Sequence, residues 1–191
     1  MTKSIDFYFD FISPYSYLAH KKIKILREKG ITFNYKPILL GGLHNLQGII
    51  APAFIKPKLD HMINDCILFA KKDNFNFTWN SNFPINSLSL MRGYLLIENG
   101  KKNLYLDIMF DGYWKDNLDV SKEDVLIKLL KKNNFDEKYF LEGIKDPKIK
   151  DELKSVTQKA HDKKIFGAPT FVINNKIFWG QDRLNFALDE Y

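Results

Sequence analysis

Two serines in the segment "FISPYS" are the first residues whose types and spacing could do chemistry, because they stand where a helix is predicted to begin. Ser13 is a favourable N-cap residue, and Pro14 is favoured at the first helical position. Ser13 and Ser16 have no histidine and carboxylate beside them in the motif, so either would be a poor nucleophile. A hydroxyl at a helix N-terminus can instead help the helix dipole to hold an anion. The segment therefore predicts an anion site.

The chain has no cysteine in this motif that could supply a sulfur anion at the predicted site. Cys66 is the only cysteine among 191 residues, which excludes an internal disulfide, a C-x-x-C redox pair and a cysteine-based zinc cluster. Cys66 lies within a predicted helix and is expected to be a small core residue. The histidines form no H-E-x-x-H or comparable metal pattern, and we expect no metal site; they are His20, His44, His61 and His161.

The elements that must position the motif form a strand, a helix and a second strand. Apolar residues alternate over 5–11, which predicts a strand, and a helix follows from Ser13 to Gly30. Alternation over 31–37 predicts the second strand. Because a helix connects them, we expect the two strands to be parallel neighbours.

The rest of the chain is helical until a C-terminal hairpin. Ser121 and Asp124 have capping-box-like spacing, and Asn174-Asn175 predicts a tight turn between "TFVIN" and "KIFWG". The predicted helices span 59–72, 87–99, 103–114, 121–132, 147–164 and 182–191. This order predicts an α/β protein with a thioredoxin-like domain of residues 1–40 and 165–191, and an all-helical domain inserted at 41–164.

Two motifs together carry a resemblance to a known family. "FYFDFISPYSYLA" and "FGAPTFVINNKIFWGQDRL" resemble the 2-hydroxychromene-2-carboxylate isomerases and kappa-class glutathione transferases, a branch of the DsbA-like proteins. The resemblance covers the whole chain, including "KPKLDHM" and "YWKDNLDV" in the helical block. DsbA-like oxidoreductases carry the cysteines of C-x-x-C where this chain has Ser13 and Ser16. The resemblance implies that the thiolate at this site belongs to bound glutathione.

The resemblance also implies a role for residues around the helix start. Ser13 is expected to face the glutathione sulfur as the catalytic residue, while Ser16 is a second-line candidate that could merely satisfy a backbone donor. The segment "GAPT" resembles the family's cis-proline loop. A cis bond before Pro169 would expose the backbone of Ala168 for antiparallel pairing with the peptide-like ligand.

Further glutathione contacts are implied farther from the sulfur. Asp182 and Arg183 match the segment that holds the γ-glutamyl end, where an ion-pairing aspartate and an arginine fork suit an ammonium and a carboxylate. Lys58 matches a lysine near the glycine carboxylate. An asparagine ligand of the kappa-class enzymes falls near Ile49 here, and Asn45 is the asparagine nearest to it in the sequence.

The resemblance predicts a glutathione-dependent cis-trans isomerase acting on a small aromatic or electrophilic substrate. The alternatives are a kappa-type glutathione transferase or peroxidase and a non-catalytic glutathione-binding module, whereas the absent C-x-x-C argues against a thiol-disulfide oxidoreductase. Trp114 and Trp179 match aromatic positions of the isomerases and could line the substrate pocket, although large aromatic residues are more often core.

Charge and hydropathy bear on partners and compartment. The net charge is +6, but the basic residues lie in scattered doublets, so we expect no nucleic-acid partner. No apolar run is long enough to span a bilayer, and the first ten residues lack a secretory hydrophobic region. We therefore expect no membrane partner and a cytoplasmic protein. The resemblance implies a homodimer.

Overall fold

A four-stranded mixed sheet forms the centre of the protein, whose computed structural model describes residues 3–191. The sheet has the strand order β2-β1-β3-β4. β1 is parallel to β2 and antiparallel to β3, and β3 forms a hairpin with β4. Asn174 and Asn175 in that hairpin have φ of 51° and 59°, which confirms the predicted tight turn. The strands are β1 (Ile5–Phe9), β2 (Phe33–Pro37), β3 (Thr170–Ile173) and β4 (Lys176–Trp179).

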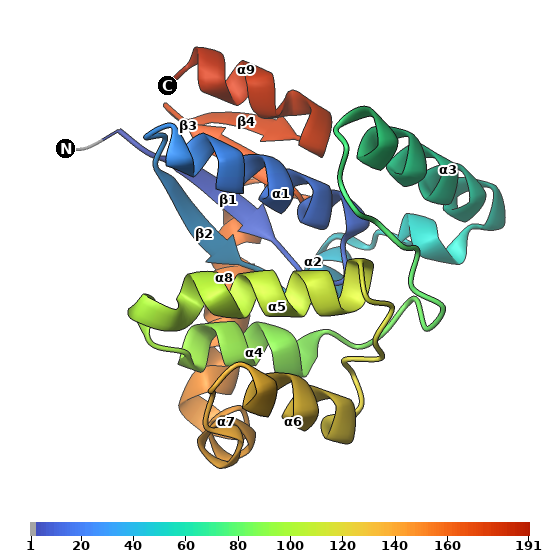
Figure 1. Cartoon of the computed structure of the whole chain (residues 1–191). Coiled ribbons are helices and arrows are strands. Elements are labelled where there is room, and N and C mark those ends of the chain that lie inside the picture. Colours follow the sequence, from blue (N-terminus) through green and yellow to red (C-terminus); the bar gives the residue numbers. More distant parts are fainter. Residues whose placement is uncertain (1–2) are drawn as a thin grey trace.

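Helices surround the sheet and form a layer beside it. Figure 1 shows α1 crossing the sheet, α9 at the top next to β4, and α4 to α7 gathered below. Within residues 3–191 no helix is both long and apolar enough to cross a membrane. The helices are α1 (Pro14–Glu28), α2 (Leu40–Gln47), α3 (Lys56–Lys72), α4 (Leu88–Leu96), α5 (Lys102–Trp114), α6 (Glu123–Lys132), α7 (Glu137–Gly143), α8 (Pro147–Asp162) and α9 (Leu184–Asp189).

Several element boundaries differ from the sequence prediction for local reasons. β1 ends at Phe9, not at residue 11, because the carboxylate of Asp10 accepts the Ile12 N–H and turns the chain. α6 begins at Glu123 without a side-chain cap, since the Ser121 hydroxyl donates to Asp119 instead. The predicted capping box is therefore wrong.

Helices α2 and α7 were not expected from the sequence. α2 contains Gly41 and Gly42, which disfavour a helix. Tertiary contacts stabilise it, because Leu43 is buried in a small apolar cluster that also includes Ala160 and Ile165. Tertiary contacts likewise anchor α7, because its own Phe140 is fully buried and packs against the Tyr105 ring of α5.

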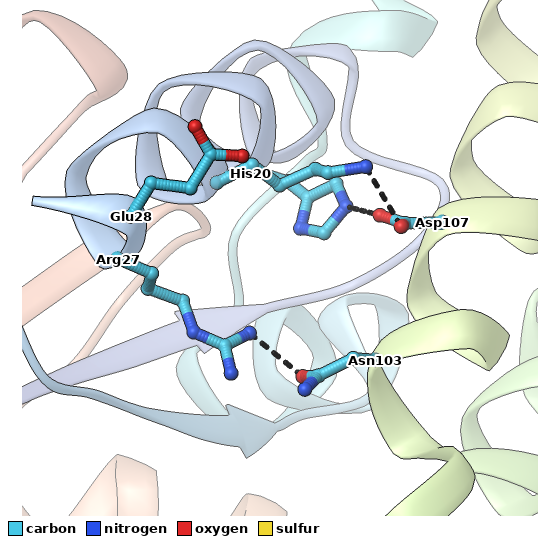
Figure 2. A pocket seen from close by; sticks show the side chains of 6 residues that line it. His20, Arg27, Glu28, Asn103 and Asp107 are labelled. Carbon is cyan, nitrogen blue, oxygen red and sulfur yellow. Dashed lines mark hydrogen bonds and ion pairs between the residues drawn. The ribbon is translucent and has the colours of Figure 1, made fainter.

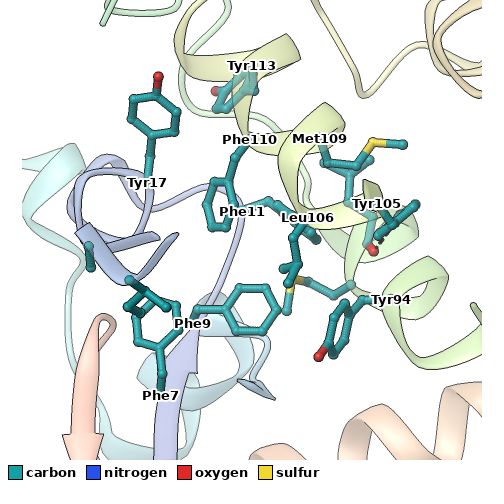
Figure 3. Packing of buried hydrophobic residues seen from close by; sticks show 14 of the residues in the cluster. Phe7, Phe9, Phe11, Tyr17, Tyr94, Tyr105, Leu106, Met109, Phe110 and Tyr113 are labelled. Carbon is teal, nitrogen blue, oxygen red and sulfur yellow. Dashed lines mark hydrogen bonds between the residues drawn. The ribbon is translucent and has the colours of Figure 1, made fainter. Parts of the chain in front are cut away.

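Aromatic side chains of β1 and the following turn join the sheet to the helical layer. Phe9 contacts Tyr94 edge to face at 5.2 Å between ring centroids, and Phe11 contacts Phe110 at 4.7 Å. Figure 3 shows these rings between the strand and helices α4 and α5. One hydrophobic cluster contains residues of both the sheet and the helical block. The division into two domains stays a prediction.

Candidate active site

Ser13 lies at the N-terminus of α1, as the sequence predicts. It is the N-cap residue, with φ −83° and ψ 115°, and its Oγ accepts a hydrogen bond of 3.1 Å from the Ser16 backbone N–H. Pro14 occupies the first helical position, where its missing N–H leaves no donor unsatisfied. The side chain is nearly buried, at 4% exposure. The hydroxyl is therefore held beside the positive end of the helix dipole.

The loop before β3 meets this helix start. The peptide bond between Ala168 and Pro169 is cis, as the family resemblance implies. The Ser13 hydroxyl donates a hydrogen bond of 3.0 Å to the Ala168 carbonyl, which joins residues 155 positions apart in sequence. On the far side of the loop, the Gly180 N–H donates to the Pro169 carbonyl at 2.9 Å. The two motifs that carry the family resemblance therefore meet at one site.

A cavity of about 900 Å³ opens at this junction. Ser13 and Ala168 line it, and Lys58 reaches it from the first turn of α3. Asn45 and Ile49, the two positions weighed for the amide contact, also line it. Lys58 is the one lysine or arginine among the cavity-lining residues that the structure describes, so this wall carries a positive charge that suits a ligand carboxylate.

Five of the candidate site residues do not line the cavity, namely Ser16, Trp114, Pro169, Asp182 and Arg183. Trp114 is fully buried, with its indole N–H donating to the Phe11 carbonyl at 2.8 Å, so of the two roles weighed for it the structure supports the core. Ser16 is buried, and its Oγ has no hydrogen-bond partner among the described residues. Asp182 and Arg183 lie just after β4, on the surface, and form an ion pair of 3.6 Å with each other. Their contact with glutathione stays a prediction.

Apolar side chains form much of the remaining wall. Trp179, the second tryptophan candidate, lines the cavity with 54% of its surface exposed, and Phe166 contacts it at 5.0 Å between ring centroids. Ile50 and Phe54 also line the cavity and are 70% and 72% exposed. Exposed aromatic and aliphatic surface around a cavity suits an apolar or aromatic ligand. Phe166 begins one quoted motif and Phe54 lies two residues before another, but neither was predicted to be a site residue.

Asp10 connects two walls of the cavity and was also missed. Its buried carboxylate accepts the Ile12 N–H at 3.1 Å and the Leu40 N–H at 2.8 Å. Burial raises the pKa of Asp10 to about 6, although these hydrogen bonds act in the opposite direction. The residue thereby ties the loop before Ser13 to the start of α2.

Tyr15 and Cys66 contribute a protonated pair of groups beside the cavity. Tyr15 lines the cavity, and its hydroxyl donates to Asp65 Oδ2 at 2.8 Å. Burial, and then this carboxylate, raise the pKa of Tyr15, so the phenol stays protonated. Burial likewise raises the pKa of Cys66, which confirms it as a core thiol that forms no thiolate near neutrality.

A second, smaller cavity of about 320 Å³ lies between α1 and α5 (Figure 2). His20 is buried there, with Nδ1 at 2.7 Å from the Tyr35 hydroxyl and Nε2 at 2.8 Å from Asp107. Burial lowers the pKa of His20, so the neutral ring donates from Nε2 to the carboxylate. Lys24 donates to the same carboxylate at 2.7 Å. These bonds join two helices and satisfy every polar atom of the ring, which marks the cluster as structural.

Comparisons with known proteins identify the family of the chain and its relatives. The sequence profile of the DSBA-like thioredoxin domain matches residues 4–191. A 2-hydroxychromene-2-carboxylate isomerase from Sphingobium xenophagum is 29% identical over 100% of this chain and 98% of its own. Glutathione S-transferase kappa 1 from Caenorhabditis elegans is 27% identical, over 97% of this chain and 89% of its own.

A solved structure extends the likeness to three dimensions. The structure of a 2-hydroxychromene-2-carboxylate isomerase matches with a TM-score of 0.88 and 25% identity, over 97% of this chain and 92% of that one. The relatives confirm the stated resemblance and the expectation of an enzyme, of isomerase or glutathione-transferase type. The match over nearly all of its length shows that the chain belongs to the DSBA-like thioredoxin domain family.

Proposed function

We propose that this protein is a glutathione-dependent cis-trans isomerase acting on a small aromatic substrate with a conjugated double bond. The observation that carries the proposal is the junction of Ser13 with Ala168 at a helix N-terminus, inside a cavity whose walls supply no thiolate. When bound, glutathione would supply a thiolate that adds reversibly to the double bond and allows it to rotate. Relatives named for this isomerisation support the choice.

Ser13 and Ala168 would exchange hydrogen bonds when the ligand enters. Without ligand, the single hydroxyl proton of Ser13 is donated to the Ala168 carbonyl. A peptide N–H of the ligand that pairs with this carbonyl would free the hydroxyl to donate to the sulfur. The hydrogen bond from Ser13 to the charged sulfur would stabilise the thiolate by about 1.5–3 kcal/mol, and the helix dipole would add about 0.3–1 kcal/mol. Together they are enough to lower a thiol pKa by one or two units.

Charged residues would hold the two ends of the tripeptide. Lys58, on the cavity wall, would pair with the glycine carboxylate. Asp182 and Arg183 would contact the γ-glutamyl end, and they follow the cavity-lining Trp179 by three and four positions. The apolar wall at Phe54, Phe166 and Trp179 would receive the aromatic substrate.

A kappa-type glutathione transferase is the second candidate, because two relatives carry that name. The transferase would use the same bound thiolate but would release the glutathione adduct as its product, whereas the isomerase would regenerate glutathione. Supplying an electrophilic aromatic halide and a conjugated aromatic pyruvate in parallel separates the two activities, since only the transferase consumes glutathione.

The decisive experiment is a titration with reduced glutathione at neutral pH that records both binding heat and thiolate ultraviolet absorbance. The wild type is expected to bind and to generate thiolate, and Ser13→Ala to bind with much less thiolate. Absence of binding by the wild type would overturn the proposal. Binding and thiolate without turnover of any substrate would instead favour the non-catalytic module.

The proposal includes a cytoplasmic homodimer that recognises neither nucleic acid nor membrane. Exposed apolar residues on α3, Ile67 at 48% and Leu68 at 65%, offer surface for a second copy. Sedimentation equilibrium tests the assembly, and a monomeric mass at micromolar concentration would contradict it.

A further inference from the structure

His44 is a buried histidine on the wall of the same cavity as Ser13, and it has no role in the function proposed above. The residue lines the cavity and is only 9% exposed. Ser13 follows β1 and His44 lies in α2, which follows β2. Because β1 and β2 are adjacent parallel strands, their carboxyl ends bring both residues to one edge of the sheet.

The ring of His44 differs from those of the other histidines in being both buried and without a partner, since His61 also lacks a partner among residues 3–191 but is exposed. Both ring nitrogens of His20 are hydrogen-bonded, and His161 contacts Gln158 and Asp162. No hydrogen bond joins the His44 ring to any residue in the range 3–191. An imidazole that is nine-tenths buried and unpartnered, facing a ligand-sized cavity, has a lone pair available to a bound molecule.

The surroundings of His44 keep this lone pair free near neutral pH. Burial lowers the pKa of His44, with no charged group contributing, so the ring is neutral in the absence of ligand. The titratable side chains that line the cavity with it are Lys58 on α3 and Tyr15 on α1. From α8, which packs against α2, the apolar Ala160 joins the cluster around Leu43.

We propose that the His44 imidazole accepts the proton of the thiol bound in this cavity, an inference that rests on the proposed function. The S–H bond breaks, its electron pair stays on sulfur, and the proton forms an N–H bond on the ring. The products are an imidazolium and a thiolate, which stabilise each other in a partly desolvated site, as in cysteine–histidine pairs of enzymes. The positioned imidazolium can return the proton later in the cycle. Ser13 then solvates the sulfur, while His44 removes its proton.

The test compares the number of protons released to solution with the number of thiolates formed when glutathione binds. Thiolate formed per site is read from ultraviolet absorbance, and protons released to a weakly buffered solution slightly above neutral pH are read with an indicator dye. The wild type is expected to release clearly fewer protons than it forms thiolates, because His44 retains them. His44→Gln, which keeps a polar side chain but cannot take up a proton, is expected to lose this retention and release one proton per thiolate.

Matched variants separate this effect from a general disturbance. His61→Gln removes an exposed imidazole of α3 that lies outside the cavity lining and should behave as the wild type. His44→Asn should repeat the His44→Gln result, with binding heat showing that each site is intact. Full proton release by the wild type, with normal thiolate, would overturn the role of His44 and leave the proposed function standing. Absence of glutathione binding would overturn both.

Discussion

At the scale of the residue, Ser13 combines three tasks in one hydroxyl group. Its oxygen caps α1 by accepting the Ser16 N–H, its proton holds the Ala168 carbonyl, and in the proposed function it turns to the ligand sulfur. The first two tasks are structural and use both the oxygen and the proton of the hydroxyl group. They therefore hold the Ser13 side chain in one orientation before the ligand binds. The N-cap was predictable from Ser13-Pro14, whereas the partner at Ala168 depends on the tertiary fold.

Lys58 provides a direct test of ligand recognition at the same scale. Lys58→Ala is expected to weaken glutathione binding about 10- to 100-fold, since a hydrogen bond to a charged group contributes roughly 1.5–3 kcal/mol. Isothermal titration calorimetry measures the effect. Lys56→Ala is the matched control, because Lys56 belongs to the same turn of α3 but pairs with Asp60 and does not line the cavity. Equal losses in the two variants would contradict the assignment.

Asp10 should make stability depend on pH. Its folded-state pKa is about 6, above the unfolded value, so the folded state binds the proton more tightly between these values. The contribution of Asp10 to the free energy of unfolding therefore rises by up to roughly 3 kcal/mol as the pH falls from 7 toward 4. We expect the unfolding free energy of the wild type, relative to Asp10→Asn, to increase over that range in urea titrations.

A control variant separates this effect from simple loss of a carboxylate. Asp151→Asn removes an exposed carboxylate of α8. The same pH-dependent difference in both variants, or a difference of opposite sign for Asp10, would show that Asp10 is not the responsible group.

At the scale of the element, the packing of α4 depends on one glycine. A Cβ at Gly93 would collide with the Phe140 ring of α7 and the Tyr105 hydroxyl of α5. Gly93→Ala should therefore lower the unfolding free energy by about 1–3 kcal/mol or more, despite the better helix propensity of alanine. Urea denaturation of the variant and the wild type measures this difference in unfolding free energy. Gly100→Ala, where a Cβ meets nothing within 4 Å, should have little effect, and a stable Gly93→Ala protein would contradict this packing.

Element prediction succeeded where local signals were strong. Pro14 and Pro147 at first helical positions, and the Asn174-Asn175 turn, are signals that act within a few residues, and α1, α8 and the hairpin formed as predicted. The sequence did not predict α2 and α7, because their stability depends on contacts with side chains far away in the sequence. The Gly41-Gly42 pair reads locally as a loop, but burial of Leu43 outweighs that preference.

At the scale of the whole molecule, the cavity is built from distant parts of the chain. Its walls come from α1, α2, α3, the loop near Pro84 and the Ala168 loop. A ligand that contacts these segments only when they are assembled binds the folded state alone. We therefore expect reduced glutathione at one hundred times its dissociation constant to raise the unfolding free energy by about 2.7 kcal/mol.

Thermal unfolding in the presence of ligand measures this stabilisation. S-methylglutathione has the same charged ends but no ionisable thiol, and at equal concentration it should raise the midpoint less than glutathione. An unchanged midpoint with saturating glutathione would contradict binding to the folded cavity. Equal shifts with both compounds would show that the charged ends, and not the thiolate, dominate the affinity.

The sequence by itself determined the first strand–helix–strand unit, the helix start at Ser13 and the C-terminal hairpin, because each is encoded within a few neighbouring residues. Its cysteine count excluded a redox pair, and the resemblance to a known family implied the cis bond before Pro169. The tertiary structure alone decided which residues share the cavity. It placed Trp179 on the wall and Trp114 in the core, although both were candidates for the substrate pocket. It also brought Asp10 and His44 to the site, since contacts across a sheet edge depend on strand order and packing, which no local pattern specifies.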